Sequence, residues 1–202
     1  MSDEVLGAVL AGGRSRRMGI DKASLEIGGQ TLARLAVDAL RAAGLDVALV
    51  LRAEQPVPLT AHTVEVVRDE VQDAGPLGGL HALLGWLPLE WALVTPCDQP
   101  FLAPNLLREL LAQPREDVDA IIGQPNELVE PLPGLYRRTC LPAAQQALDR
   151  GCHSLQDLLL ALRVRHVPVA ALRREDDQLR SYVNVNTPAD LERARSLAAD
   201  PD

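Results

Sequence analysis

The feature that most constrains the fold is a short apolar run near the N-terminus, Val5 to Leu10, which leads into Gly12 and Gly13. The run contains no polar residue, so an extended segment would be apolar on both of its faces. Strands that are buried on both faces are typical of parallel sheets covered by helices on either side. The run therefore predicts a central strand of an α/β domain.

Similar apolar runs alternate with segments of helical periodicity along the chain. Further strands are expected at 47–51, 64–67, 91–95, 118–123, 164–169 and 181–185. Helices are expected at 32–43, around 80–84, from 104, after the cap at 154 and after the cap at 187. Prolines and a glycine between 124 and 138 favour hairpin strands, and a charged turn is predicted at 173–180.

These elements predict one domain over residues 1–202, a three-layer α/β/α fold with a mixed, mostly parallel sheet. The formal charge of −8 and an aromatic content of 2% disfavour nucleic acid and anionic membranes as partners. The 3 cysteines form no CxxC pair, and no signal peptide or membrane-spanning stretch is visible. A cytoplasmic protein is the expectation.

The first segment with candidate binding chemistry follows the first predicted strand. Its sequence from Leu10 to Lys22 is LAGGRSRRMGIDK, with four basic side chains against one acidic. Glycine lets backbone amides approach a phosphate, and the basic side chains can neutralise it. The segment fits neither a Walker A loop nor a dinucleotide fingerprint. We interpret it as an anion-binding loop, and the alternative is a solvated basic turn.

Two aspartates also follow predicted strands, where ligands bind in open α/β sheets. Asp98 lies between two prolines, and a carboxylate in that place is a natural Mg²⁺ ligand beside a polyphosphate. Asp69 precedes a Gly-Pro loop and could accept hydrogen bonds from a nucleoside. The alternatives are a helix cap for Asp98 and a tight connection for the loop after Asp69.

These segments, in this order, resemble the molybdenum cofactor guanylyltransferases, the MobA family of nucleotidyltransferases. The matching segments are LAGGRSRRMGIDK at 10–22, RDEVQDAGPLGGL at 68–80, PCDQPFL at 96–102, EPLPGLY at 130–136 and VNVNTPADL at 183–191. The resemblance implies a Rossmann-like fold of the nucleotide-diphospho-sugar transferase type. The chain departs from the family at 51–53, where an Asn is often found, and at Gly134, where Ala is more common.

The resemblance implies Mg²⁺-dependent transfer of GMP from GTP to the terminal phosphate of molybdopterin, with release of pyrophosphate. It also implies transient contact with proteins that deliver molybdopterin and with client molybdoenzymes. A molybdopterin cytidylyltransferase, another small-metabolite nucleotidyltransferase and a non-catalytic carrier of molybdopterin or nucleotide are the alternatives.

The resemblance also assigns the site residues. Nucleotide would be bound by Leu10, Ala11, Gly12, Gly13, Lys22, Asp69 and Asp98. Catalysis would depend on Lys22, Asp98 and Arg17. The metal would be held by Asp98 and Asn186, and the alternative for Asn186 is the start of a helix capped by Thr187.

Overall fold

The computed structural model describes residues 4–12, 21–57, 64–71, 73–126 and 129–199. Within them, seven strands form one sheet in the order β5-β4-β1-β6-β8-β7-β9. All strands run parallel except β8, which is antiparallel to both of its neighbours. The strands are β1 Val5–Leu10, β4 Val47–Arg52, β5 Glu65–Asp69, β6 Trp91–Pro96, β7 Ala120–Gln124, β8 Gly134–Arg137 and β9 Val164–Pro168.

Strand β1 is the centre of the fold because all six of its residues are buried. It pairs with β4 on one side and with β6 on the other, so its Leu10 lies beside both Val50 and Pro96. Its alternate side chains enter two separate cores, one on each face of the sheet. The predicted central strand and the predicted three-layer fold are therefore confirmed.

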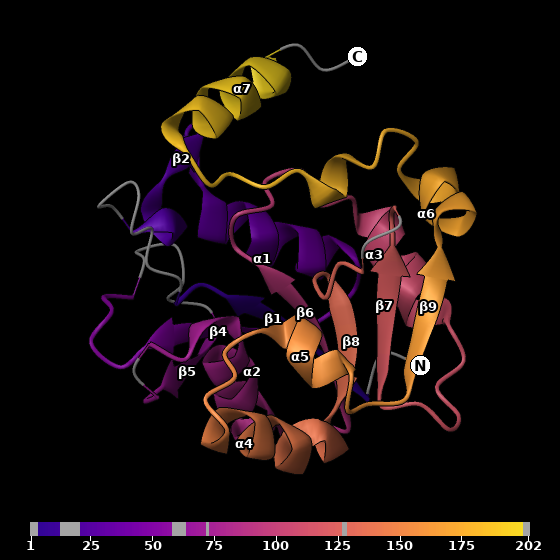
Figure 1. The fold of residues 1–202 in the computed structure, drawn as a ribbon. Coiled ribbons are helices and arrows are strands. Elements are labelled where there is room, and N and C mark those ends of the chain that lie inside the picture. The colour runs from indigo at the N-terminus through magenta and orange to yellow at the C-terminus, as the bar shows by residue number, and fades with distance from the viewer. Residues whose placement is uncertain (1–3, 13–20, 58–63, 72, 127–128, 200–202) are drawn as a thin grey trace.

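Helices cover both faces of the sheet (Figure 1). Helices α1, α3 and α6 pack on one face and α2, α4 and α5 on the other. The helices are α1 Leu32–Ala42, α2 Gly75–Trp86, α3 Pro104–Ala112, α4 Leu141–Asp149, α5 Leu155–Leu159, α6 Val169–Glu175 and α7 Pro188–Ala199. None of the helices in the described ranges is long and apolar enough to cross a membrane.

Helix α7 packs away from the main layers, against a small hairpin. The hairpin consists of β2 Glu26–Ile27 and β3 Gln30–Thr31 and follows the 3-10 helix η1, Lys22–Ser24. A third apolar cluster joins the hairpin and α1 to α7. This packing brings the C-terminal part of the chain back to its N-terminal part (Figure 1).

One predicted strand was wrong. The segment 181–185 contains the end of a 3-10 helix, η4 Arg180–Tyr182, and no strand. The Asp176 carboxylate accepts the backbone N–H groups of Arg180 and Ser181 at 3.0 and 2.8 Å, which turns the chain. The Val185 N–H then donates to the Asp98 carbonyl at 2.8 Å. The segment thus crosses the end of β6 instead of pairing along the sheet.

Gly134 is required by close packing at the start of β8. A Cβ at this position would lie 2.6 Å from the Pro131 carbonyl oxygen and 2.7 Å from Ile122 Cδ1. Both distances are shorter than real Cβ contacts. The glycine at this departure from the family pattern therefore matches its local surroundings.

We predict that Gly134→Ala lowers the free energy of unfolding by about 2 kcal/mol, because both neighbours must shift. Ile122→Val removes the Cδ1 methyl and alone should cost about 1 kcal/mol. Since the valine also relieves one of the two clashes, the double variant should lose less stability than the sum of the single losses. Urea unfolding checks this, and strict additivity would contradict the packing explanation.

Candidate active site

The loops singled out from the sequence meet at one edge of the sheet. Strands β1, β4, β5 and β6 are parallel, so their carboxyl ends all face this edge. Gly12 follows β1, Asp69 ends β5, and Asp98 follows β6. This edge therefore collects the candidate residues from segments far apart in the sequence.

A lysine ammonium is the centre of a small polar cluster at this edge. Lys22 Nζ lies 2.7 Å from Asp98 Oδ2 and 2.7 Å from Asn186 Oδ1. The Lys22 and Asp98 side chains are only 13% and 19% exposed. Because water is largely excluded, this ion pair is screened less than one on the surface. The structure thus brings together Lys22, Asp98 and Asn186, three residues that the resemblance assigned to the site.

Asn186 is held in place by the cap of helix α7. The Asp190 carboxylate accepts hydrogen bonds from the backbone of Asn186 at 3.2 Å and of Thr187 at 2.9 Å. In return, the Asp190 N–H donates to the Thr187 hydroxyl at 3.2 Å, which completes a capping box. The bonds from Thr187 and Asn186 hold the pKa of Asp190 below its usual range. Because Thr187 is the cap, the Asn186 side chain is left to reach Lys22.

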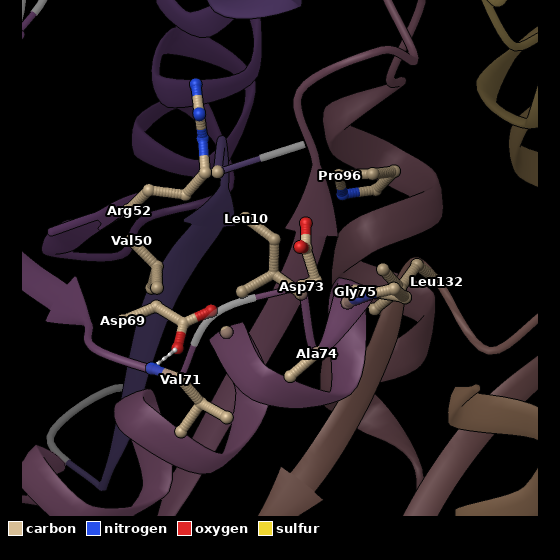
Figure 2. Close-up of a pocket in the computed structure, with 13 residues that line it drawn as sticks. Leu10, Val50, Arg52, Asp69, Val71, Asp73, Ala74, Gly75, Pro96 and Leu132 are labelled. Carbon is tan, nitrogen blue, oxygen red and sulfur yellow. Dashed lines mark hydrogen bonds between the residues drawn. The ribbon is translucent and has the colours of Figure 1, made fainter. Parts of the chain in front are cut away.

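A cavity of about 290 Å³ lies at the same edge of the sheet, and its lining includes none of the three side chains of the Lys22 cluster. It is lined by the ends of β1, β4 and β5, the start of α2, and residues near β6 and β8. Asp69 Oδ1 accepts the Val71 N–H at 3.0 Å, and Figure 2 shows the carboxylate directed toward Leu10 and helix α2. Burial raises the pKa of Asp69. The cavity therefore presents a desolvated acceptor to a ligand.

Gly78 lets helix α2 approach the end of β5 closely. A Cβ at Gly78 would lie 2.6 Å from Ala74 Cβ and 2.9 Å from Asp69 Oδ2. At Gly79 a Cβ would make only an ordinary contact with the Leu10 side chain, at 3.4 Å. The GPLGG motif is thus more than a tight connection, because it seats the Asp69 carboxylate against the first turns of the helix.

The predicted glycine-rich loop is described only in part. Gly13 and Arg17 lie outside the described residues. Leu10 and Gly12 line the cavity. The Ala11 N–H donates to the Val50 carbonyl at 2.9 Å, so it is already engaged within the protein. Of the three described residues, Leu10 and Gly12 are therefore the ones that face a ligand.

Arg52 is a further residue at the carboxyl end of a strand, where ligands bind in open α/β sheets, and the sequence analysis did not assign it to the site. Arg52 ends β4 and lines the cavity, and its Cγ would lie 3.3 Å from a Cβ at Gly12. Figure 2 shows its side chain extending away from Asp69. Its Nε is buried and has no hydrogen-bond partner among the residues that the structure describes. An anion or a base edge at the mouth of the cavity would meet this guanidinium.

Cys97 has no catalytic role in this arrangement. Its side chain is buried in the core beneath the edge, and burial raises the pKa of its thiol. A buried thiol with a raised pKa is a poor nucleophile. The interpretation of Cys97 as a small core residue is confirmed.

The donor set at the edge suits a hard cation that also binds phosphate. Asp98 and Asn186 both direct an oxygen at one ammonium, so their side chains can converge on a single cation. Across the described ranges, no group of three or more His, Cys, Asp or Glu side chains could hold a metal. Mg²⁺ commonly takes one or two protein oxygens together with phosphate oxygens and water. The residues present therefore fit Mg²⁺ bound together with a phosphate ligand.

The fold is that of the nucleotidyltransferases, as comparison with solved structures shows. The solved structure of molybdopterin-guanine dinucleotide biosynthesis protein A from Archaeoglobus fulgidus is similar, with a TM-score of 0.84 and 28% identity over 96% of this chain and 98% of that one. A nucleotidyl transferase from Methanothermobacter shares the fold, with a TM-score of 0.75 and 21% identity over 98% of each chain.

Sequence comparison defines the family. The model of the MobA-like NTP transferase domain matches residues 7–169. A probable molybdenum cofactor guanylyltransferase from Opitutus terrae is 40% identical over 94% of each chain. Another from Pelotomaculum thermopropionicum is 33% identical over 96% of this chain and 94% of its own length. The chain belongs to the MobA-like NTP transferase family, and it is an enzyme of that class.

Gly78→Ala tests the close approach of α2 to Asp69. We expect the variant to weaken binding of nucleoside triphosphate about tenfold, because the new methyl displaces the Asp69 carboxylate. Gly85→Ala in the same helix is the control, since nothing lies within 4 Å of its Cβ. That variant should be slightly more stable and bind normally. Equal binding by both variants in calorimetric titration would contradict the proposed contact.

Asp69→Asn tests the desolvation of the carboxylate. The raised pKa means that folding favours protonated Asp69, so ionisation of Asp69 lowers stability as the pH rises through its folded pKa. The asparagine variant should therefore be more stable than the parent at pH 7, and the difference should shrink in acid.

Asp119→Asn is the control for this pH dependence, because the pKa of Asp119 is shifted in the opposite direction from that of Asp69. Hydrogen bonds from Arg163 lower the pKa of Asp119, so its ionised form stabilises the fold, and this contribution is lost as the pH falls. Its asparagine variant should be less stable than the parent at pH 7. Urea unfolding at pH 7 and at about pH 4 measures both differences. A less stable Asp69→Asn at pH 7 would contradict the assignment.

Proposed function

We propose that this enzyme transfers GMP from GTP to the terminal phosphate of molybdopterin and releases pyrophosphate, with Mg²⁺ as cofactor. The observation that carries the proposal is the Lys22 ammonium between Asp98 and Asn186, at the same sheet edge as the cavity that contains Asp69. The similar proteins named as molybdenum cofactor guanylyltransferases support the choice of substrates.

The chemistry asks the protein mainly for positioning and charge neutralisation. The terminal phosphate of the acceptor is already an anion at pH 7, so its in-line attack on the α-phosphorus of GTP needs no general base. The Lys22 ammonium neutralises the phosphates, and Arg17 adds positive charge in the basic segment. Asp98 and Asn186 would hold Mg²⁺, which stabilises the charge that develops on the phosphates and on departing pyrophosphate.

The cavity suits a nucleoside that is rich in hydrogen-bond donors. Asp69 offers carboxylate oxygens, and guanine presents an N1–H and an amino group while ribose presents hydroxyls. Gly12 leaves room for backbone approach, and the guanidinium of Arg52 stands at the end of the neighbouring strand. These groups together favour GTP bound with its nucleoside near Asp69 and its phosphates near Lys22.

In this proposal molybdopterin binds beside the phosphates of GTP, and the dinucleotide product is passed to a client molybdoenzyme. Proteins that deliver molybdopterin and molybdoenzymes that receive the dinucleotide are proposed as transient partners, with the cytoplasm as the place of the reaction. A cytidylyltransferase of the same pterin and a non-catalytic carrier are the alternatives that the assay below separates.

The deciding assay measures pyrophosphate release from each nucleoside triphosphate, with and without molybdopterin and Mg²⁺. We expect release with GTP only when both molybdopterin and Mg²⁺ are present. Faster release with CTP would assign the cytidylyl reaction instead. Binding of GTP and molybdopterin without any release would assign a carrier.

Asp98→Ala should reduce pyrophosphate release at least about a thousandfold while the unfolding transition stays cooperative, because the variant loses a proposed metal ligand. Asp38→Ala is the matched control, since it removes an exposed ion pair with Arg34 on α1. The control should retain turnover and lose at most about 0.5 kcal/mol of stability. Normal turnover by Asp98→Ala would overturn the role of Asp98.

A further inference from the structure

One buried amide side chain joins the two ends of the glycine-rich basic segment. Gln55, in the loop after β4, is 3% exposed. Its Nε2 donates to the Ala11 carbonyl oxygen at 2.9 Å and to Asp21 Oδ2 at 2.8 Å. Its Oε1 accepts the Arg52 N–H at 3.3 Å. Both amide hydrogens and the amide oxygen are therefore used.

The two acceptors of Gln55 stand at either end of the basic segment. Ala11 follows the central strand β1, and Asp21 precedes the 3-10 helix η1. Residues 12–20 between them contain the glycines and arginines of the predicted anion-binding loop. A single planar amide thus fixes the distance between the points where this segment leaves the sheet and where it returns.

The link continues from Asp21 to the ammonium of Lys22. Asp21 Oδ1 accepts the Ala23 N–H at 3.1 Å, and the Asp21 carbonyl accepts the Ser24 N–H at 3.2 Å. These bonds set the start of η1, of which Lys22 is the first residue. One carboxylate oxygen of Asp21 therefore caps the helix that carries Lys22, while its other oxygen is held by Gln55.

Gln55 is itself braced from the neighbouring strand. Its backbone N–H donates to the Arg52 carbonyl at 3.1 Å and closes a turn. Nη1 of Arg68, on β5, donates to the Gln55 carbonyl at 2.6 Å and to the Arg52 carbonyl at 2.9 Å. Because the turn is fixed at the sheet, the amide can act as a rigid support for the segment opposite.

We propose that Gln55 is a positioning residue that fixes the two described ends of the basic segment, at Ala11 and Asp21, and through Asp21 positions Lys22 for the nucleotide. The assignment rests on the proposed function, because it presumes that Lys22 and the basic segment bind the nucleotide. Gln55 acts through Asp21, so its loss should weaken nucleotide binding and leave pterin binding unchanged.

Gln55→Met keeps the length of the side chain and removes all three hydrogen bonds. The Ala11 carbonyl and the Asp21 carboxylate then lose a buried donor, which loosens the start of η1. We expect the dissociation constant for GTP with Mg²⁺ to rise about tenfold, and that for molybdopterin to stay within about twofold. Gln113→Met is the control, since within the described part of the chain the Gln113 amide bonds to Glu109 of α3 and not to the basic segment or η1.

A double variant that exchanges the amide and the carboxylate, Gln55→Glu with Asp21→Asn, distinguishes positioning from a general loss of stability. We call it the swapped pair. Gln55→Glu places a carboxylate against both the Asp21 carboxylate and the Ala11 carbonyl, so it should weaken GTP binding more than the methionine does, and the repulsion between the two carboxylates is the larger part. Adding Asp21→Asn supplies an N–H donor to that carboxylate and keeps an oxygen for the Ala23 N–H. The combined variant should bind GTP about tenfold tighter than Gln55→Glu alone. If Gln55→Met does not fold, the swapped pair carries the test.

Amide hydrogen exchange in the ligand-free protein separates this proposal from the proposed function. The amides of Ala23 and Leu25 should exchange about tenfold faster in Gln55→Met than in Gln113→Met. Unchanged exchange, unchanged GTP binding in Gln55→Met, or no rescue by the swap overturns the role of Gln55. A parent protein that binds no nucleotide overturns the proposed function, and the exchange result then still decides whether Gln55 fixes η1.

Discussion

Burial of β1 on both faces is the constraint on which the rest of the structure depends. A strand with no polar face must be covered by helices on either side and paired along both edges. Its neighbours β4 and β6 run in the same direction, so the ends of all three strands meet at one edge. Hydrophobic burial in the first ten residues thereby determines where the polar chemistry can gather.

At that edge, polar side chains are held by partners that are themselves fixed. Lys22 faces Asp98 and Asn186, and Asn186 is set by the cap of α7. Asp69 is seated against α2 because Gly78 has no side chain. Among the described residues, Lys22, Asn186 and Asp69 are therefore each oriented by contacts within the protein.

Periodicity predicted the elements with strong apolar patterns, such as β1, α1 and β4, because burial decides their structure. The segment 181–185 has a strand-like composition, but the Asp176 carboxylate and a bond to the Asp98 loop turned it away from the sheet. The resemblance to the family selected Lys22, Asp98 and Asn186 as site residues, but their contacts with one another follow only from the structure. Gln55 was not predicted as a functional residue, because the role of a buried amide depends on which carbonyl and carboxylate groups the fold places beside it.

The two side-chain contacts of Lys22, an ion pair with Asp98 and a hydrogen bond to Asn186, also constrain the order in which the fold can form during synthesis. The two partners of Lys22 lie 76 and 164 positions further along the chain. During synthesis, strand β1 can be paired on both sides only after β6 has been made. The Lys22 ammonium can bond to Asn186 only after nearly the whole chain has been made. A growing chain can thus pair β1 on both sides well before Lys22 has both of its partners, and the Lys22 cluster is completed only after the segment before α7 has been made.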